Sequence, residues 1–227
     1  MHESADEHTL QKILGNNDEL AEHNREHFDE MKMWAINFMS APGAGKTRLL
    51  EYMLTAWSGL SASVIEGDMV GELDAVRLRK TGTEVLQIST GRSCHLDAQM
   101  VGRLLHHNQL KKTDVLFIEN VGNLVCPAEF WLGEHTKIVL LSVTEGDDKP
   151  IKYPVIFRNC DAVIFTKCDL LEYVDFDLAA ATEHVRVLNP AAKTFAVSVV
   201  TGQGLPALMS WLKLQLNNYK LDRRCPN

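Results

Sequence analysis

The sequence lacks the features of several special classes of protein. No apolar run approaches the roughly 18 to 20 residues of a membrane span, and no basic segment followed by an apolar one opens the chain, so we expect a cytoplasmic protein that does not bind membranes. Cysteine is scarce: its five irregular positions do not suggest a disulfide framework and predict reduced thiols. Basic residues are outnumbered, 23 against 30 acids, and the net charge of −7 argues against a nucleic-acid partner.

What is present fits a globular protein with one large core. The 227 residues are 45% hydrophobic and 23% charged, both near the average for soluble domains. The charge is uneven, because residues 1–31 hold nine acids and two bases while the rest is balanced. We expect an acidic helical extension over 1–32, one main domain over 33–220 and a short tail over 221–227.

The extension carries four histidines, which permit two interpretations. His2, His8, His23 and His27 suggest a metal-binding tail. The alternative is a solvated helix packed on the edge of the domain, which we favour because the extension contains no dense tract of histidine or cysteine.

Short apolar, β-branched runs alternate with helical stretches through the main domain. We expect strands at 34–39, 61–66, 84–88, 114–119, 137–143, 162–166 and 194–198, and helices near 47–57, 74–80, 96–107, 177–188 and 205–217. Several of these strands are continuously apolar, as in parallel strands covered on both faces. This alternation predicts an α/β fold: a doubly wound, mostly parallel sheet of about seven strands with helices on both faces.

The segment S-A-P-G-A-G-K-T (40–47) lies between the first strand and the first helix, and it predicts a phosphate-binding loop (P-loop). In such a loop the backbone N–H groups and the helix N-terminus surround phosphate oxygens, and glycines allow the close approach. Lys46 is then expected to contact the β- and γ-phosphates as a catalytic residue, and the Thr47 hydroxyl to bind Mg²⁺. The nucleotide-binding residues expected here are Gly43, Ala44, Gly45, Lys46, Thr47 and Arg48. Ser40 stands where the generic pattern has glycine.

A second motif indicates the base. Thr166-Lys167-Cys168-Asp169 follows a predicted strand and resembles the N-K-x-D motif of GTPases, in which the Asp accepts hydrogen bonds from guanine. Adenine offers no such pair of donors, so Asp169 favours guanine. Thr166 replaces the usual Asn, which we expect to weaken anchoring of the loop more than base choice. Ser198 and Val199 begin the segment expected to close over the base.

Acidic residues at two strand ends are candidates for magnesium binding and hydrolysis. Asp68 and Glu119 end strands that finish beside the P-loop, and we assign both as catalytic, with Asp68 also a magnesium ligand. Asp74 follows Asp68, and Gly122 completes a Glu-x-x-Gly pattern whose glycine N–H meets the γ-phosphate. The alternative is that these acids only cap strand ends.

Cys94, His95 and Cys126 follow predicted strands at the same edge of the sheet. Thiolates and imidazole suit Zn²⁺ or Ni²⁺ rather than Mg²⁺. From spacing alone a small buried hydrophobe is the more common role of a lone cysteine, and we assign that role to Cys160, Cys168 and Cys225. His106 and His107, on a predicted helix, receive no metal role.

The segments S-A-P-G-A-G-K-T, T-G-R-S-C-H-L-D-A-Q-M, F-I-E-N-V-G-N-L-V-C-P-A, S-V-T-E-G-D-D-K-P-I-K-Y-P and T-K-C-D-L-L together closely resemble the HypB family, over roughly residues 33–217. The resemblance implies a GTPase that assists nickel insertion during [NiFe]-hydrogenase maturation, with GTP and Mg²⁺ bound and with dimerisation linked to GTP. It also implies Ni²⁺ or Zn²⁺ on Cys94, His95 and Cys126. The implied partners are a second copy of the chain, the nickel-delivery chaperone HypA and the hydrogenase large-subunit precursor.

Three departures from the family pattern leave alternatives open. The N-terminal C-x-x-C-G-C nickel motif of many bacterial members is absent, Gly71 stands where members usually have Thr, and Thr166 replaces Asn. The last two changes suit a nucleotide-gated interaction protein with decayed catalysis. The related urease-type nickel GTPase is another alternative, but its C-P-H-type segment differs from E-N-V-G-N-L-V-C-P.

Overall fold

A seven-stranded sheet forms the centre of the molecule, in the order β3-β2-β4-β1-β5-β6-β7, with every neighbouring pair parallel. The computed structural model describes residues 3–69, 71–107 and 110–222. Its strands are β1 (Trp34–Ser40), β2 (Ala62–Asp68), β3 (Glu84–Ser89), β4 (Val115–Glu119), β5 (Thr136–Ser142), β6 (Ala162–Thr166) and β7 (Lys193–Ala196). This is the doubly wound parallel sheet that the sequence predicts, and each strand lies within a few residues of its predicted range.

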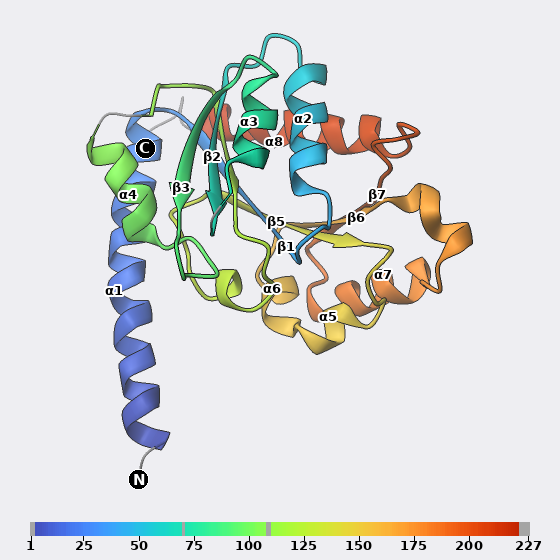
Figure 1. The fold of residues 1–227 in the computed structure, drawn as a ribbon, viewed down its shortest axis with the longest axis horizontal. Coiled ribbons are helices and arrows are strands. Elements are labelled where there is room, and N and C mark those ends of the chain that lie inside the picture. The colour runs from blue at the N-terminus through green and yellow to red at the C-terminus, as the bar shows by residue number, and fades with distance from the viewer. Residues whose placement is uncertain (1–2, 70, 108–109, 223–227) are drawn as a thin grey trace.

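Helices cover both faces of the sheet (Figure 1). The helices are α1 (Glu3–Glu30), α2 (Lys46–Ala56), α3 (Leu73–Arg79), α4 (Ala98–His106), α5 (Lys149–Lys152), α6 (Pro154–Arg158), α7 (Leu178–Leu188) and α8 (Leu205–Asp222), with 3₁₀ turns η1 (Cys126–Ala128) and η2 (Cys168–Tyr173). Successive side chains of a strand point to opposite faces. Ile36 and Phe38 of β1 accordingly pack with α2 and α8, whereas Ala35 packs with α1 and α4.

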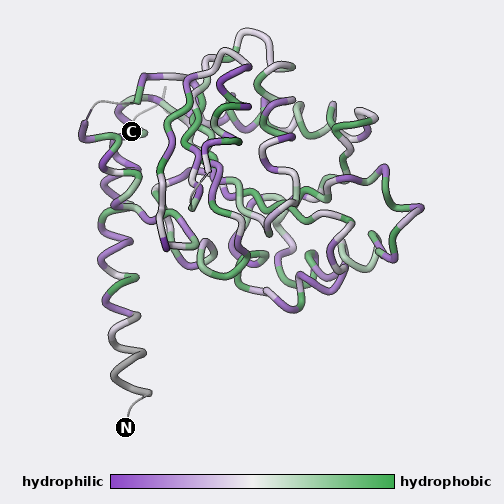
Figure 2. The backbone as a smooth tube through the Cα atoms, in the orientation of Figure 1, coloured by the Kyte–Doolittle hydropathy of each residue, from purple (hydrophilic) through white to green (hydrophobic). Residues whose placement is uncertain are grey.

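The central strands are buried on both sides, which explains their continuous apolar sequences. Every residue of β1, β4 and β6 is buried, whereas the edge strands β3 and β7 are partly exposed. Hydrophobic residues predominate along the central strands and hydrophilic residues along the coloured part of α1 (Figure 2).

The short helices α5 and α6 were not predicted from the sequence. Each carries a proline in its first turn, Pro150 and Pro154. N–H groups in the first turn of a helix have no partner within the helix, so a proline, which lacks this N–H, is tolerated there. These two prolines therefore begin helices and do not interrupt them.

Helix α1 lies along the edge of the domain and its N-terminal half extends beyond the body (Figure 1). Polar side chains fix its other half: Asn24 Nδ2 donates to the carbonyl oxygens of Ala98 and Leu132 at 2.8 and 3.1 Å, and Arg25 donates to Glu134 O at 2.8 Å. The extension is therefore helical and packs on the domain, as we favoured. In the described ranges no helix is long and apolar enough to cross a membrane.

The strand order fixes where a ligand fits. From β1 the chain builds one side of the sheet with β2, β3 and β4 and the other with β5, β6 and β7. At such a switch in direction the loops leaving the carboxyl ends of the strands separate and leave a crevice. The P-loop, Asp68 and Glu119 all lie at this crevice.

Candidate functional site

The loop between β1 and α2 has the backbone geometry of a phosphate cradle. Gly43 and Gly45 have φ angles of +74° and +94°, which strongly favour glycine. Lys46 and Thr47 are buried, and the Lys46 ammonium donates to Ser40 Oγ at 2.8 Å. Burial lowers the pKa of Lys46, and nearby carboxylates, Glu119 first, partly offset this effect. Ser40, at the first position of the motif, therefore holds the Lys46 side chain in place by accepting its hydrogen bond.

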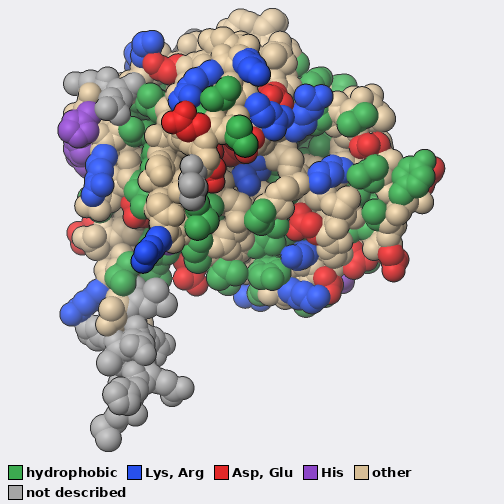
Figure 3. Space-filling view, viewed as in Figure 1, with side chains coloured by type: hydrophobic (Ala, Val, Ile, Leu, Met, Phe, Trp, Pro, Cys, Tyr) green, Lys and Arg blue, Asp and Glu red, His purple; other side chains and the backbone are tan. Residues whose placement is uncertain are grey.

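A pocket of about 530 Å³ opens beside this loop. Acidic and basic side chains gather on this face of the molecule over α2 and α3 (Figure 3). The residues lining the pocket are Pro42, Gly43, Gly45, Lys46, Thr47, Arg48, Glu66, Gly67, Asp68, Met69, Asp74, Arg77, Glu119, Asn120, Val121 and Gly122. The pocket thus brings the P-loop together with the four residues predicted at or after the two strand ends, Asp68, Asp74, Glu119 and Gly122.

Two buried carboxylates in this pocket are only partly satisfied. Thr47 Oγ1 donates to Glu119 Oε1 at 2.7 Å, but Glu119 Oε2 and Glu66 Oε2 have no hydrogen-bond partner among the described residues. Burial raises the pKa of Glu119 to about 7 and that of Glu66 to about 8. Unpartnered carboxylate oxygens beside a threonine hydroxyl fit a hard cation such as Mg²⁺. Glu66, which the sequence analysis did not assign, pairs in register with Glu119 across β2 and β4.

Asp68 organises the turn that follows β2. Its carboxylate accepts from the backbone N–H groups of Met69 and Gly71 at 2.6 and 2.9 Å. A Cβ at Gly71 would lie 2.6 Å from Asp68 Oδ2, so a larger residue needs a different turn. Asp74 is 3.3 Å from Arg77, which also pairs with Glu51 at 2.7 Å. Asp68 and Asp74 both line the 530 Å³ pocket beside the P-loop, which we call the phosphate pocket.

Gly122 is required by its packing. A Cβ there would lie 2.9 Å from Pro42 Cα, so only glycine lets the end of β4 pass this close to the P-loop.

A second pocket, of about 380 Å³, lies on the other side of the P-loop. Its lining is mostly apolar and consists of Ala44, Gly45, Arg48, Leu49, Thr166, Lys167, Asp169, Leu170, Val197, Val199 and Val200. Thr166 Oγ1 donates to Ala44 O at 2.6 Å, and Lys167 Nζ donates to Gly43 O at 2.8 Å. Thr166 therefore fastens this motif to the P-loop through one side-chain hydrogen bond. The apolar slot with one carboxylate at its edge suits a flat purine.

Ser198 and Val199 have different positions. Val199 lines the second pocket. Ser198 is buried, and its hydroxyl accepts from the N–H groups of Val200 and Thr201 at 3.2 and 3.1 Å. Its side chain thus shapes the loop and does not line the pocket.

Cys94, His95 and Cys126 meet although 32 residues separate the cysteines. The two sulfur atoms are 3.0 Å apart, His95 Nδ1 is 3.9 Å from Cys94 Sγ, and one ligand atom from each residue lies within 4.8 Å of the others. The His95 ring stacks on Phe130, and burial lowers its pKa, which favours the neutral imidazole that binds metals. Cys94, Cys126, Cys160 and Cys168 are free thiols, while Cys225 lies outside the described residues.

Asn120 connects the two centres, a role that the sequence analysis missed. Its Oδ1 accepts from Leu96 N at 3.1 Å, one residue beyond His95, and its own backbone follows Glu119. Its Nδ2 donates to Asn37 Oδ1 at 3.3 Å, and Asn37 donates to Glu134 Oε1 at 3.3 Å. Because these partners are far apart in sequence, no local pattern indicates the network.

The parallel sheet, the P-loop and the two adjoining pockets define a P-loop nucleotide-binding protein of the α/β class. A family model described as CobW/HypB/UreG, nucleotide-binding domain, matches residues 35–196. The chain belongs to this family.

Within the family the chain is similar to proteins named hydrogenase maturation factor HypB. It is 48% identical to that of Rhizobium leguminosarum bv. viciae, over 89% of this chain and 68% of the relative, and 44% identical to that of Escherichia coli K12, over 89% and 70%. A crystal structure of HypB from Helicobacter pylori in complex with nickel superposes with a TM-score of 0.84 at 41% identity, covering 90% of this chain and 97% of the other. HypB from Archaeoglobus fulgidus gives a TM-score of 0.83 at 39% identity, covering 89% and 99%.

Proposed function

We propose that this protein is a magnesium-dependent GTPase whose nucleotide state controls dimerisation and the binding of nickel, or zinc, at Cys94, His95 and Cys126. It would act in the cytoplasm in nickel insertion into a [NiFe]-hydrogenase precursor. Its partners would then be a nickel-delivery chaperone of the HypA type and the hydrogenase large subunit. The similarity to HypB proteins supports this proposal, as does a nickel complex known for one of them.

The observation that carries the proposal is the shared edge of the nucleotide pocket and the Cys/His cluster. Asn120 follows Glu119, an acid of the phosphate pocket, and holds the backbone of Leu96 beside His95. A movement of the β4 end in response to the γ-phosphate would therefore reach the metal ligands through one side chain. Coupling of this kind suits a protein that releases a metal on hydrolysis.

In this proposal each pocket residue has a defined task. Lys46 would leave Ser40 and neutralise phosphate charge, as P-loop lysines do. Thr47, Asp68 and the unpartnered oxygen of Glu66 would hold Mg²⁺, which would offset charge on the β- and γ-phosphates. Glu119 would orient the attacking water, and Asp169 would accept the hydrogen bonds of guanine.

The metal at the Cys/His cluster would be cargo. Three ligands are one short of the four that a closed zinc site uses, so water or a second protomer would complete the shell. In a two-fold dimer each ligand occurs twice near the axis, which would link metal binding to assembly.

The test compares nickel affinity, measured by competition with a colorimetric chelator, with and without a non-hydrolysable GTP analogue. We expect Cys126→Ala to lose nickel from the Cys/His cluster while keeping GTP binding, and Lys46→Ala to lose GTP binding or turnover. Asn120→Ala should still bind nickel and GTP, but GTP should no longer change the affinity for nickel. Cys160→Ala, a buried thiol outside the cluster, is the matched control. Equal nickel affinity of wild type and Cys126→Ala in both nucleotide states would refute the proposal.

A further inference from the structure

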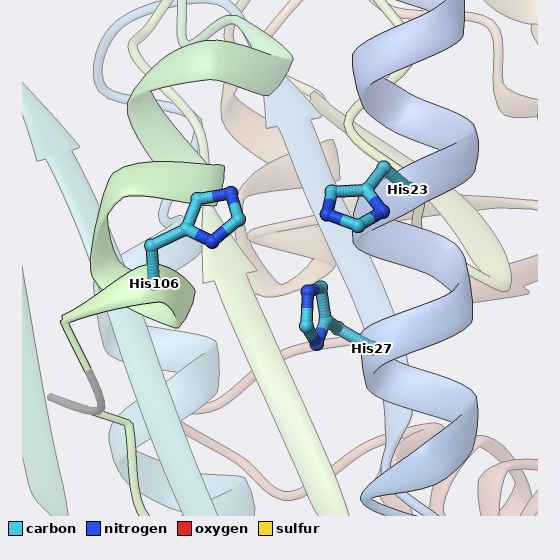
Figure 4. Close-up of side chains that lie close together, drawn as sticks. All are labelled: His23, His27 and His106. Atoms are coloured by element: carbon cyan, nitrogen blue, oxygen red, sulfur yellow. The ribbon is translucent and has the colours of Figure 1, made fainter.

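Three histidines from two helices converge on one point at the edge of the domain, apart from the Cys/His cluster. His23 and His27 lie one turn apart on α1, and His106 is the last residue of α4. Their ring centroids are 4.6, 5.4 and 5.6 Å apart, and one nitrogen of each ring lies within 4.8 Å of the others. In Figure 4 the three side chains point from the two helices into a common space. From the sequence, His106 received no metal role because it lies on a predicted helix.

A carboxylate lies within 4 Å of each of the two α1 histidines. His23 Nδ1 is 3.7 Å from Glu26 Oε2, and His27 Nδ1 is 3.8 Å from Glu30 Oε2. Each Nδ1 thus faces an acid three residues ahead on the same helix, which leaves Nε2 free to bind. Histidines that bind metals are commonly oriented by a carboxylate on the other ring nitrogen.

A second observation points to a ligand in the space between the rings. Nε2 of His27 is buried and has no hydrogen-bond partner within the described part of the chain. A buried polar atom without a partner destabilises the folded protein, because it has lost its hydrogen bonds to water. A bound cation would remove this cost.

We propose that His23, His27 and His106 form a second metal site, for a divalent cation of borderline softness such as Ni²⁺ or Zn²⁺. The three grouped ligands are all imidazoles, which disfavours Mg²⁺ and Ca²⁺ because these ions prefer oxygen ligands. Water would complete the coordination. Because His23 and His106 are exposed, the ion would exchange with solvent.

The backbone around the site is already held in place. Asn24, between the two α1 histidines, donates to Ala98 O, and Asn17 Oδ1 accepts from Ala98 N at 2.9 Å. In a tetrahedral zinc site the ligand nitrogens are roughly 3.3 Å apart, as follows from bonds of about 2.0 to 2.1 Å. Rotation of the side chains about their χ angles would bring the three nitrogens to this spacing without moving either helix.

Helix α4 carries this site at one end and begins three residues after His95. Its nine residues span about 14 Å, so the two sites would lie at opposite ends of one rigid element. An ion at the histidines would tie α1 to α4 and restrain the helix that leads from the Cys/His cluster. The proposal does not depend on GTP hydrolysis.

The experiment uses the full chain with Cys94→Ser and Cys126→Ser, so that the thiolate cluster is removed. Titration with Co²⁺ followed by absorbance should give d–d bands without a thiolate charge-transfer band, and Zn²⁺ should displace the Co²⁺. Adding His106→Gln or His27→Gln should weaken binding by more than about tenfold. His107→Gln, which changes the exposed neighbouring histidine, is the matched control and should leave the affinity unchanged.

Hydrogen exchange gives an independent measurement on the same proteins. Zn²⁺ should slow exchange in the last two turns of α1 in the Cys→Ser background, and His106→Gln should abolish this protection. Absence of Co²⁺ and Zn²⁺ binding in that background would overturn the proposal, as would binding that His27→Gln and His106→Gln leave unchanged. A thiolate charge-transfer band would also overturn it, because it would place the ion on a remaining cysteine.

Discussion

Ser40 shows how one residue changes the resting state of the phosphate loop. In place of the usual glycine it offers a hydroxyl that accepts a hydrogen bond from Lys46, whose burial already disfavours its charged form. The lysine is thus held near the position where phosphate would bind. A triphosphate replaces this single neutral acceptor with charged oxygens, which form stronger hydrogen bonds with an ammonium group.

Base selection depends on one carboxylate in the apolar slot. Asp169→Asn presents an amide donor where the carboxylate only accepted, so guanine loses its partner and xanthine gains one. We expect GTP affinity to fall by at least about a hundredfold and affinity for xanthosine triphosphate to rise. Fluorescence titration with labelled nucleotides measures both, and GTP affinity equal to that of wild type would exclude a role for Asp169 in reading the base.

The partly satisfied carboxylates predict how stability depends on pH. The folded-state pKa values of Glu66 and Glu119, about 8 and about 7, lie above the ordinary value of 4.5. Without ligands the folded protein therefore retains protons that the unfolded chain releases between pH 4.5 and 8. The free energy of unfolding should fall as pH rises through this window, by several kcal/mol in total.

Urea unfolding of the nucleotide-free protein between pH 5 and 8.5 measures this effect. Glu66→Gln cannot ionise and should flatten the dependence. If the free energy of unfolding depended on pH equally in wild type and Glu66→Gln, the raised pKa of Glu66 would be contradicted. Mg²⁺ with nucleotide favours the charged carboxylates and should raise stability most at the alkaline end.

At the scale of elements, the strands were predictable because their burial leaves a local pattern. A parallel strand covered on both faces is continuously apolar, and the predicted range 34–39 matches β1, Trp34–Ser40. The P-loop was equally visible, because its glycines and lysine are adjacent in sequence. The Asn120 network and the three histidines were not, since their members come from distant segments that only the folded sheet brings together.

Polar contacts fix α1 on the domain, and Asn24 is central to them. Asn24→Ala removes a buried donor from the carbonyl groups of Ala98 and Leu132. We expect the free energy of unfolding to fall by about 1 to 3 kcal/mol, because two carbonyl groups lose their partner. Urea denaturation measures the loss, and Asn16→Ala, on the exposed side of the same helix, should change stability by less than about 0.5 kcal/mol. Equal effects of the two substitutions would show that Asn24 does not hold the helix.

For the molecule as a whole, the proposed dimerisation would place α3 at the interface, because apolar side chains of α3 are exposed beside the phosphate pocket. Leu73 and Val76 of α3 are exposed, Leu73 to 81%, next to Asp74 of the pocket. Sedimentation should show a doubling of mass with a GTP analogue and Mg²⁺, and no change with GDP. Leu73→Asp should keep the protein monomeric while nucleotide affinity is retained, because a charge would be buried at the interface. Leu214→Asp, which alters an exposed leucine of α8, is the control and should still dimerise.

The position of β1 in the sheet has a consequence for synthesis on the ribosome. Its two neighbours, β4 and β5, begin at Val115 and Thr136, about 80 and 100 residues after β1 begins. At a translation rate of about 5 to 20 residues per second, this fully buried strand stays without a neighbouring strand for several seconds. Newly made chains therefore expose an apolar segment that the finished protein never exposes. Yield in the cell should depend on chaperones that bind nascent chains more than on the stability of the folded state.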